Sequence, residues 1–248
     1  MDAALAAFAV LPGLAVGSFL NVAAVRLPMR RSIVSPRSAC TTCEMPIAWY
    51  DNVPLLSYLL LRGRCRSCGV PIGLIYPSVE LVTAALLAGC LAAFGLSLRT
   101  AAEAIFCSAL VVVTGTDLTH RMVPNRVVLP AIVLVLGLMT ADDPSLEWAA
   151  AGAGAFLFMF VAAVAYPSGL GMGDVKLALL MGVALGRTVP VALFAGMIAA
   201  LVPAVALLVR HGAKARKMGI PFAPFLAVGS VLALFAGHAL LDAYLTVL

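Results

Sequence analysis

The stretch Trp148–Tyr166, WAAAGAGAFLFMFVAAVAY, decides the fold class of this 248-residue chain. It contains no charged side chain, and it is close to the length of about 20 apolar residues that an α-helix needs to cross a membrane. The whole chain is 63% hydrophobic and 11% charged, with a mean hydropathy of +1.10. Soluble domains carry about 25% charged residues. The sequence therefore predicts an all-α polytopic membrane protein.

Apolar runs recur along nearly the whole chain, and about eight transmembrane helices are expected. The predicted spans are Ala4–Val25, Ile75–Gly95, Ala101–Thr116, Val127–Thr140, Trp148–Tyr166, Val175–Gly186, Pro190–Val209 and Phe222–Val247. Val127–Thr140 and Val175–Gly186 fall short of about 20 residues, so they are either extended by flanking turns or only partly inserted. Met1–Val25 is interpreted as a retained first helix rather than a signal peptide, because its basic cluster follows the apolar stretch.

The basic residues predict the orientation in the membrane. With the N-terminus outside, the outer loops hold only Arg99 and Arg187 of the 16 lysines and arginines. The cytoplasmic segments then hold Arg26, Arg30, Arg31, Arg37, Arg62, Arg64, Arg66, Arg121, Arg126, Lys176, Arg210, Lys214, Arg216 and Lys217. Cytoplasmic loops are enriched in such residues. The net charge of +5 is accordingly a topology signal, and no nucleic-acid partner is expected, since the charges are spread over separate loops.

Three regions are expected: a first transmembrane helix over 1–25, a cytoplasmic domain over 26–76, and a membrane core over 77–248. The middle region is the one sizeable polar segment. Within it, Ile47–Tyr58 is rich in aromatic residues and leucines. This composition suits a segment that lies on the bilayer surface, and it suits equally a piece of domain core.

The cytoplasmic domain carries two Cys-x2-Cys pairs. Four thiolates on two tight turns form the ligand set of a closed, tetrahedral structural Zn²⁺ site. A metal ion would stabilise a domain of about fifty residues, which cannot bury much core. Redox-active thiols or a disulfide pair are the alternative. The predicted metal ligands are Cys40, Cys43, Cys65 and Cys68, whereas Cys90 and Cys107 are interpreted as small buried apolar residues.

Two acids lie where apolar segments meet short polar turns: Asp117, in VTGTDLTH, and Asp174, in GLGMGDVKL. The predicted topology brings both to the cytoplasmic membrane surface. Two carboxyl groups a few Å apart cannot both ionise, so one can serve as base and the other as acid in peptide hydrolysis. Structural alternatives exist for each residue alone: Asp174 as a helix-start residue, and Asp117 as a partner of Arg121 one turn later.

Other polar residues are assigned lesser roles. The glycines of the turn before Asp174, namely Gly169, Gly171 and Gly173, allow close approach of another backbone. Glu80 is the candidate for a supporting role, since acids at membrane depth are costly and usually functional. Glu103 is expected to be solvated near the outer surface. The chain contains no His-x-x-x-His pair and no phosphate-binding loop, which disfavours a catalytic metal protease and an ATP-driven machine.

Taken in order, these motifs resemble the type IV prepilin peptidase family over nearly the whole chain. The motifs that carry the resemblance are Gly17-Ser18-Phe19-Leu20-Asn21-Val22, Arg26-Leu27-Pro28, the four-cysteine loop with Trp49-Tyr50-Asp51-Asn52 and Leu61-Arg62-Gly63-Arg64-Cys65, Tyr76-Pro77-Ser78-Val79-Glu80-Leu81, Asp117 with Val123-Pro124, Gly171-Met172-Gly173-Asp174-Val175-Lys176-Leu177, and Ile220-Pro221-Phe222. The resemblance implies a bacterial inner-membrane aspartyl protease of the Gly-x-Gly-Asp type. Asp117 and Asp174 would be its catalytic pair, with Lys176 in the active-site loop.

The resemblance also implies substrates and cofactors. The family removes the basic leader of prepilins and pseudopilins on the cytoplasmic side, after a glycine, and members with the four-cysteine loop methylate the new N-terminal amine with S-adenosylmethionine. Membrane lipid and pilus or type II secretion machinery are the further partners expected; the oligomeric state is not predicted. A protease without methyltransferase activity, a proton-coupled transporter and a zinc-stapled scaffold are the alternative functions.

Three positions depart from the family pattern. Asn125 follows Pro124 where the family often has Asp, Thr41 replaces a common Pro, and Ala223 stands where Gly usually follows Pro-Phe. None of them is expected to touch the aspartate pair.

Overall fold

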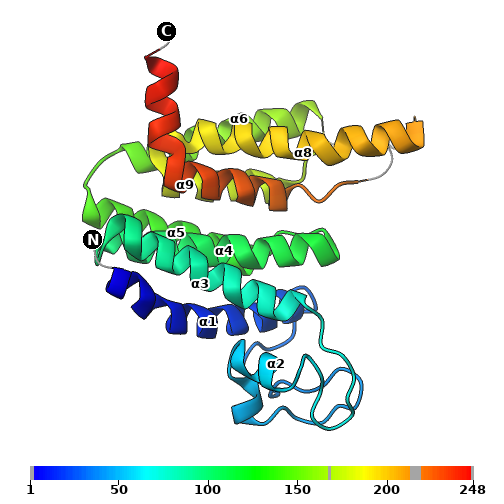
Figure 1. The fold of residues 1–248 in the computed structure, drawn as a ribbon. Coiled ribbons are helices and arrows are strands. Elements are labelled where there is room, and N and C mark those ends of the chain that lie inside the picture. Colours follow the sequence, from blue (N-terminus) through cyan, green and yellow to red (C-terminus); the bar gives the residue numbers. More distant parts are fainter. Residues whose placement is uncertain (1–2, 167–168, 213–218, 247–248) are drawn as a thin grey trace. The chain divides into compact units, whose positions relative to one another are not determined.

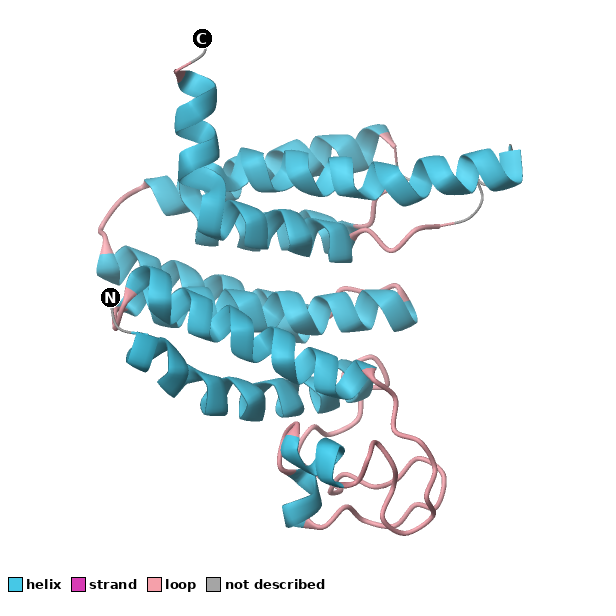
Figure 2. Cartoon of the chain, viewed as in Figure 1, coloured by secondary structure: helices cyan, strands magenta, loops and turns pink. Residues whose placement is uncertain are grey.

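The computed structural model describes residues 3–166, 169–212 and 219–246, and in these residues the chain is helical, with isolated β-bridges as its only strand-like pairing (Figures 1 and 2). The elements are α1 (Ala3–Arg26), η1 (Trp49–Asn52), α2 (Leu56–Leu60), α3 (Ile75–Phe94), α4 (Leu98–His120), α5 (Asn125–Asp142), α6 (Glu147–Ala165), α7 (Met172–Leu185), η2 (Gly186–Thr188), α8 (Val189–His211) and α9 (Ala223–Leu245).

Each predicted span corresponds to one of these helices, namely α1 and α3 to α9. Helices α4 and α5 are longer than predicted because polar residues extend both ends of each apolar run. For example, the Ser97 side chain caps α4 by accepting a hydrogen bond from the Thr100 N–H. Val247, at the end of the last predicted span, and Lys214, Arg216 and Lys217 lie outside the described residues.

Seven stretches of the described chain are long and apolar enough to cross a membrane. One of them, Met172–His211, has 40 residues and contains both α7 and α8. Gly186 interrupts it with a φ of +55°, a left-handed conformation that glycine adopts without strain. The sequence prediction counts α7 and α8 as two spans, whereas here they form one interrupted stretch. This is the only difference between the eight predicted spans and the seven observed stretches.

The chain forms two compact units, Met1–Leu96 and Ser97–Leu248. In the first unit, α1 and α3 run side by side in opposite directions (Figure 1). Glycines permit this close approach: a Cβ atom at Gly13 would lie 2.6 Å from the Cα of Ala84, and one at Gly17 would lie 2.6 Å from the Cα of Glu80. The cysteine-containing segment connects these two helices.

The second unit is built from α4 to α9, and α7 is its core. Helix α7 has 14 residues, nine of them buried, and it packs against α4, α5, α6 and α9. The predicted short span gains about one turn at its start, and the surrounding helices cover it. Its first turn carries Asp174.

Candidate functional site

Asp117 lies in the last turn of α4, with 7% of its surface exposed. Its Oδ2 atom accepts a hydrogen bond of 3.0 Å from the N–H of Ala223, the first residue of α9. The positive charge of Arg121 acts on the same carboxyl group. Free backbone N–H groups at a helix start attract anions. The carboxyl group of Asp117 is therefore oriented by the beginning of another helix, 106 positions later in the chain.

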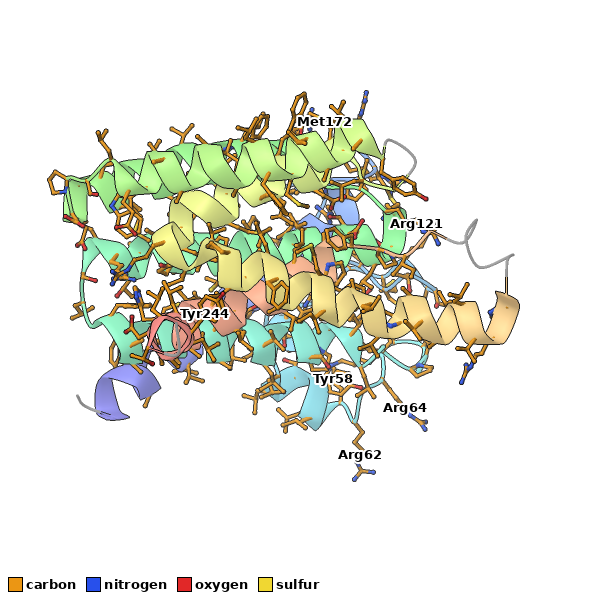
Figure 3. All side chains as sticks on the ribbon, turned by 90° about the horizontal axis from the view of Figure 1, so that it is seen from above. Tyr58, Arg62, Arg64, Arg121, Met172 and Tyr244 are labelled. Carbon is orange, nitrogen blue, oxygen red and sulfur yellow. The ribbon has the colours of Figure 1, made fainter. Side chains whose placement is uncertain are left out.

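Asp174 lies in the first turn of α7 and is half-buried. Its Oδ2 atom accepts a hydrogen bond of 3.3 Å from the Gly171 N–H. Asp174 is thus also a helix-capping residue, as the structural alternative suggested. Arg121, after the end of α4, and Met172, at the start of α7, lie at the same end of the second unit (Figure 3), and the charge of Asp117 acts on the carboxyl group of Asp174. The two aspartates therefore lie at the same end of the second unit.

The glycine turn is packed against the loop that follows α4. A Cβ atom at Gly173 would lie 2.8 Å from the Cβ of Val123, so the turn comes this close only because residue 173 has no side chain. Lys176 Nζ donates a 3.1 Å hydrogen bond to Asn125 Oδ1. These contacts hold the start of α7 beside the chain that follows Asp117.

The other two glycines of the turn have different surroundings. Gly171 is the N-cap residue of α7, in extended conformation. A side chain at Gly169 would collide with the ring of Tyr166. The whole turn is exposed or half-buried, so it leaves Asp174 accessible.

One of the three family departures, Ala223, touches the aspartate pair, which corrects the expectation from sequence, and a second, Asn125, contacts Lys176. The Ala223 N–H binds Asp117, and Asn125 binds Lys176. Ala223 acts through its backbone, a contact that any residue except proline provides, and Asn125 supplies an oxygen acceptor as Asp would. The substitutions are therefore compatible with the arrangement even though they lie within it.

Glu103 is completely buried rather than solvated. It lies on the same face of α4 as Phe106, Leu110, Val113 and Asp117, all of which are buried. The spacing of three to four residues between these positions places them on one side of a helix. This spacing could be read from the sequence. It indicates the burial of Glu103 better than its position near the start of the helix does.

Glu80 belongs to the first unit, where it is 8% exposed. Its Oε2 atom accepts a hydrogen bond of 2.8 Å from the N–H of Leu55, the residue before α2. Leu55 has a φ of +59°, which is unfavourable for a branched side chain. The observed role of Glu80 is to hold this backbone turn on α3.

The four predicted metal ligands form one cluster, and their Sγ atoms all lie within 4.8 Å of one another. The Sγ atoms of Cys40 and Cys68 are 3.8 Å apart. Tetrahedral coordination with Zn–S bonds of about 2.3 Å places sulfur atoms roughly 3.8 Å apart. The residues therefore fit a four-thiolate Zn²⁺ site, and none of the four forms a disulfide.

The electrostatics of this cluster also fit a cation. The backbone N–H groups of Cys43 and Thr42 lower the pKa of Cys40 to about 6. At Cys68, the Val70 N–H lowers the pKa, but desolvation and the neighbouring thiols outweigh it and raise the pKa to about 12. A divalent cation at the cluster would offset the effects that raise the pKa of Cys68.

The cysteine turns form an internal repeat that the sequence analysis missed. Cys40-Thr41-Thr42-Cys43-Glu44-Met45-Pro46-Ile47 and Cys65-Arg66-Ser67-Cys68-Gly69-Val70-Pro71-Ile72 share a Cys-x2-Cys-x2-Pro-Ile pattern. Their backbones form matching hydrogen bonds: Cys40 N–H to Met45 O and Cys65 N–H to Val70 O, then Ile47 N–H to Ser38 O and Ile72 N–H to Gly63 O. The shared Pro-Ile was the available signal.

Fold and site together define a multi-pass membrane protein with two carboxyl groups, each bound by a backbone N–H at the start of a helix, and a separate four-thiol cluster. Residues 11–94 match the bacterial peptidase A24 N-terminal domain, and residues 104–205 match the type IV leader peptidase family. The chain belongs to the type IV leader peptidase family. Among its relatives, a prepilin leader peptidase/N-methyltransferase of Bacillus subtilis is 37% identical over 94% of this chain and 95% of the relative.

Other relatives carry the same description. The one from Myxococcus xanthus is 40% identical over 82% of this chain and 63% of its own length, and the one from Burkholderia pseudomallei strain 1026b is 36% identical over 93% and 85%. No solved structure matches the chain.

Proposed function

We propose that this chain is a prepilin leader peptidase and N-methyltransferase of a bacterial inner membrane. It removes the leader of prepilins and pseudopilins after a glycine, on the cytoplasmic side, and then methylates the new N-terminus. The observation that carries the proposal is that Asp117, bound to the first N–H of α9, and Asp174, in the first turn of α7, lie at the same end of the second unit. The relatives described as prepilin leader peptidase/N-methyltransferase, similar over most of the chain, support both activities.

Proteolysis is carried out by the two carboxyl groups acting as a unit. They share one proton, so that one carboxylate accepts a proton from water while the other carboxylic acid donates one to the carbonyl oxygen of the scissile bond. Water oxygen forms a bond to the carbonyl carbon. The tetrahedral intermediate then collapses with cleavage of the carbon–nitrogen bond, and the amine leaves with a proton.

The surrounding backbone holds the pair in place. Asp117 is oriented by the first N–H of α9, and Asp174 by the Gly171 N–H. The exposed turn around Gly171 offers backbone that an extended substrate segment can approach closely. Lys176 and Asn125 hold this turn against the loop after α4.

The four-cysteine cluster is proposed to hold a structural zinc ion. Cys40, Cys43, Cys65 and Cys68 would saturate its coordination, so that it supplies folding energy to its unit.

Methylation draws on S-adenosylmethionine as the methyl donor. The new amine nitrogen forms the bond to the methyl carbon, the sulfonium–carbon bond breaks, and the amine loses a proton.

The test is mass spectrometry of a prepilin incubated with the purified protein, with and without S-adenosylmethionine. We expect Asp117→Asn and Asp174→Asn each to lower cleavage at least about 1,000-fold, as expected for groups that act as a unit. Asp142→Asn, which changes an exposed acid at the end of α5, serves as the matched control and should cleave normally.

Cleavage by both site variants would refute the catalytic assignment. Leader loss without methyl gain in the presence of S-adenosylmethionine would reduce the function to that of a protease.

A further inference from the structure

The segment after the first cysteine pair exposes an apolar surface, the leucine face, made of Trp49, Leu56, Leu59 and Leu60. Their exposed fractions are 81%, 54%, 63% and 73%. The three leucines lie at spacings of three and four in α2, so they share one side of that helix. The sequence left open whether this segment is domain core or lies on the bilayer. The exposure of these side chains excludes the core.

The opposite side of α2 is firmly attached to the domain. Ser57 is buried, donates a 2.9 Å hydrogen bond to Tyr50 O and accepts one of 3.1 Å from the Val53 N–H. The Tyr58 hydroxyl donates to Ile72 O at 3.2 Å. The leucine face is therefore held in position by the hydrogen bonds on the opposite side of α2.

The attachment to α3 places α2 at interfacial depth. Glu80, which binds the Leu55 N–H at the start of α2, is five residues into α3. At 1.5 Å per residue this is about 7–8 Å from the inner end of that helix. Interfacial helices bury their apolar face about 5–10 Å into the headgroup and acyl boundary. Helix α2 also runs across the direction of α1 and α3 (Figure 1), as a helix lying in the plane of the membrane would.

Basic residues follow the leucine face directly. Arg62 and Arg64 are exposed and project away from the body of the first unit (Figure 3). Residues 26–76 hold seven arginines against Glu44 and Asp51, a net charge of +5. A four-thiolate zinc centre carries a formal charge of −2, which still leaves the domain positive. Positive charge beside an apolar face is the pattern that binds anionic lipid surfaces.

We propose that the leucine face lies on the cytoplasmic leaflet of the membrane, with Trp49 and the α2 leucines at the acyl boundary and Arg62 and Arg64 on the phosphates of anionic lipids. Two observations select lipid over a protein partner. The start of α2 is hydrogen-bonded to α3, a helix of membrane-spanning length, and the charge of the domain is opposite to that of the leaflet. The proposal does not depend on the catalytic assignment.

The test is fluorescence quenching of the full chain in lipid nanodiscs. Trp148→Phe leaves Trp49 as the single tryptophan of the two. We expect lipid bromines near the headgroup to quench Trp49 at least twofold more than bromines near the bilayer centre. We expect phosphatidylglycerol to strengthen this quenching relative to phosphatidylcholine alone. Arg62→Gln with Arg64→Gln should abolish the phosphatidylglycerol effect, whereas Arg126→Gln, which removes a single positive charge elsewhere, should retain it.

Two controls keep the outcome decisive. Leu59→Asn with Leu60→Asn should lose the lipid quenching while metal content is unchanged, which excludes unfolding as the cause. If Trp148→Phe does not fold, the difference in quenching between the natural protein and Trp49→Phe measures the same quantity. Absence of lipid quenching overturns the proposal: strong quenching by aqueous iodide would then show a water-exposed face, and weak quenching by both would show a face covered by protein.

Discussion

At the residue scale, backbone amides rather than side chains orient the candidate catalytic carboxyl groups. Asp117 accepts from Ala223, and Asp174 accepts from Gly171. Amides at helix starts are rigid, and their dipoles are directed at the carboxyl oxygens. This arrangement tolerates side-chain variation at the donor residue, which explains how Ala223 replaces the glycine common in the family without removing the contact.

Glu80 gives a prediction in the first unit. Glu80→Ala removes the acceptor of the Leu55 N–H, and an unsatisfied buried donor costs about 1–3 kcal/mol. We expect faster hydrogen exchange over residues 53–60, while Glu80→Gln, which keeps an oxygen acceptor, restores most of the protection. Equal exchange in the Ala variant and the natural protein would show that this contact does not hold α2.

Asp51 gives a prediction of pH dependence. Two hydrogen bonds from Arg66, of 2.7 and 2.6 Å, hold the pKa of the Asp51 carboxyl below its usual value of 3.8, against an opposing effect of desolvation. Because the pKa of Asp51 is lower in the folded than in the unfolded protein, the ion pair stabilises the fold at pH values above 3.8. This stabilisation is lost as the pH falls through the folded pKa. We expect the Asp51 carboxyl carbon, followed by NMR, to titrate below 3.8 and to shift upward in Arg66→Gln. A midpoint at or above 3.8 in the natural protein would contradict the ion pair.

At the element scale, close contacts between helices position α7, and through it Asp174. A Cβ atom at Gly182 would strike the carbonyl oxygen of Ala151 and would lie 2.6 Å from the Cα of Gly152. Both are backbone atoms of α6 and cannot move aside without shifting the helix. The position of α7, and with it the position of Asp174, therefore depends on Gly182 at the crossing with α6.

Gly182→Ala should force α6 and α7 apart. Overpacking of this kind costs about 1–3 kcal/mol, so we expect a lower unfolding temperature in detergent and, under the proposed function, slower prepilin cleavage. Gly154→Ala is the matched control on α6, because nothing lies within 4 Å of the added Cβ and alanine favours helix. Indistinguishable unfolding temperatures for the two variants would mean that the crossing is looser than the structure shows.

At the scale of the whole molecule, the thiol cluster and the two candidate catalytic acids lie in two different compact units. The thiol cluster belongs to Met1–Leu96, and the carboxyl pair belongs to Ser97–Leu248. The segment around the cluster has few buried apolar side chains, and the second unit contains most of the buried apolar core. Loss of metal should therefore affect the two units unequally.

Metal removal tests this division. We expect about one zinc per purified chain, and none in Cys40→Ser or Cys68→Ser, while Cys90→Ala in α3 retains it. Chelation should open residues 26–76 to protease and leave residues 97–212 protected, since metal binding is coupled to folding only where the ligands lie. Metal in Cys40→Ser and Cys68→Ser, or equal loss of protection in both units, would contradict this expectation.

Much of the fold and of the candidate site followed from local signals. Hydropathy located the helices within a few residues, and the Cys-x2-Cys spacing identified the thiol cluster. The prediction was wrong where the tertiary surroundings decide the outcome: Glu103 was assigned to solvent and is buried, and Ala223 was expected not to touch the aspartate pair and contacts Asp117. Each of these depends on which helix lies opposite, and that is not a property of neighbouring residues.

The sequence by itself determined the class of protein, the helices, the thiol ligand set and the two candidate acids. The class and the helices follow from the transfer free energy of apolar residues, and the ligand set and the acids follow from side-chain chemistry. Both are properties of individual positions in the chain. Only the tertiary structure decided that Asp117 is held by the first N–H of α9, that Gly173 lies against Val123 and that Glu80 holds the start of α2. Those contacts join residues far apart in sequence, and they form because packing leaves each buried polar group a particular partner.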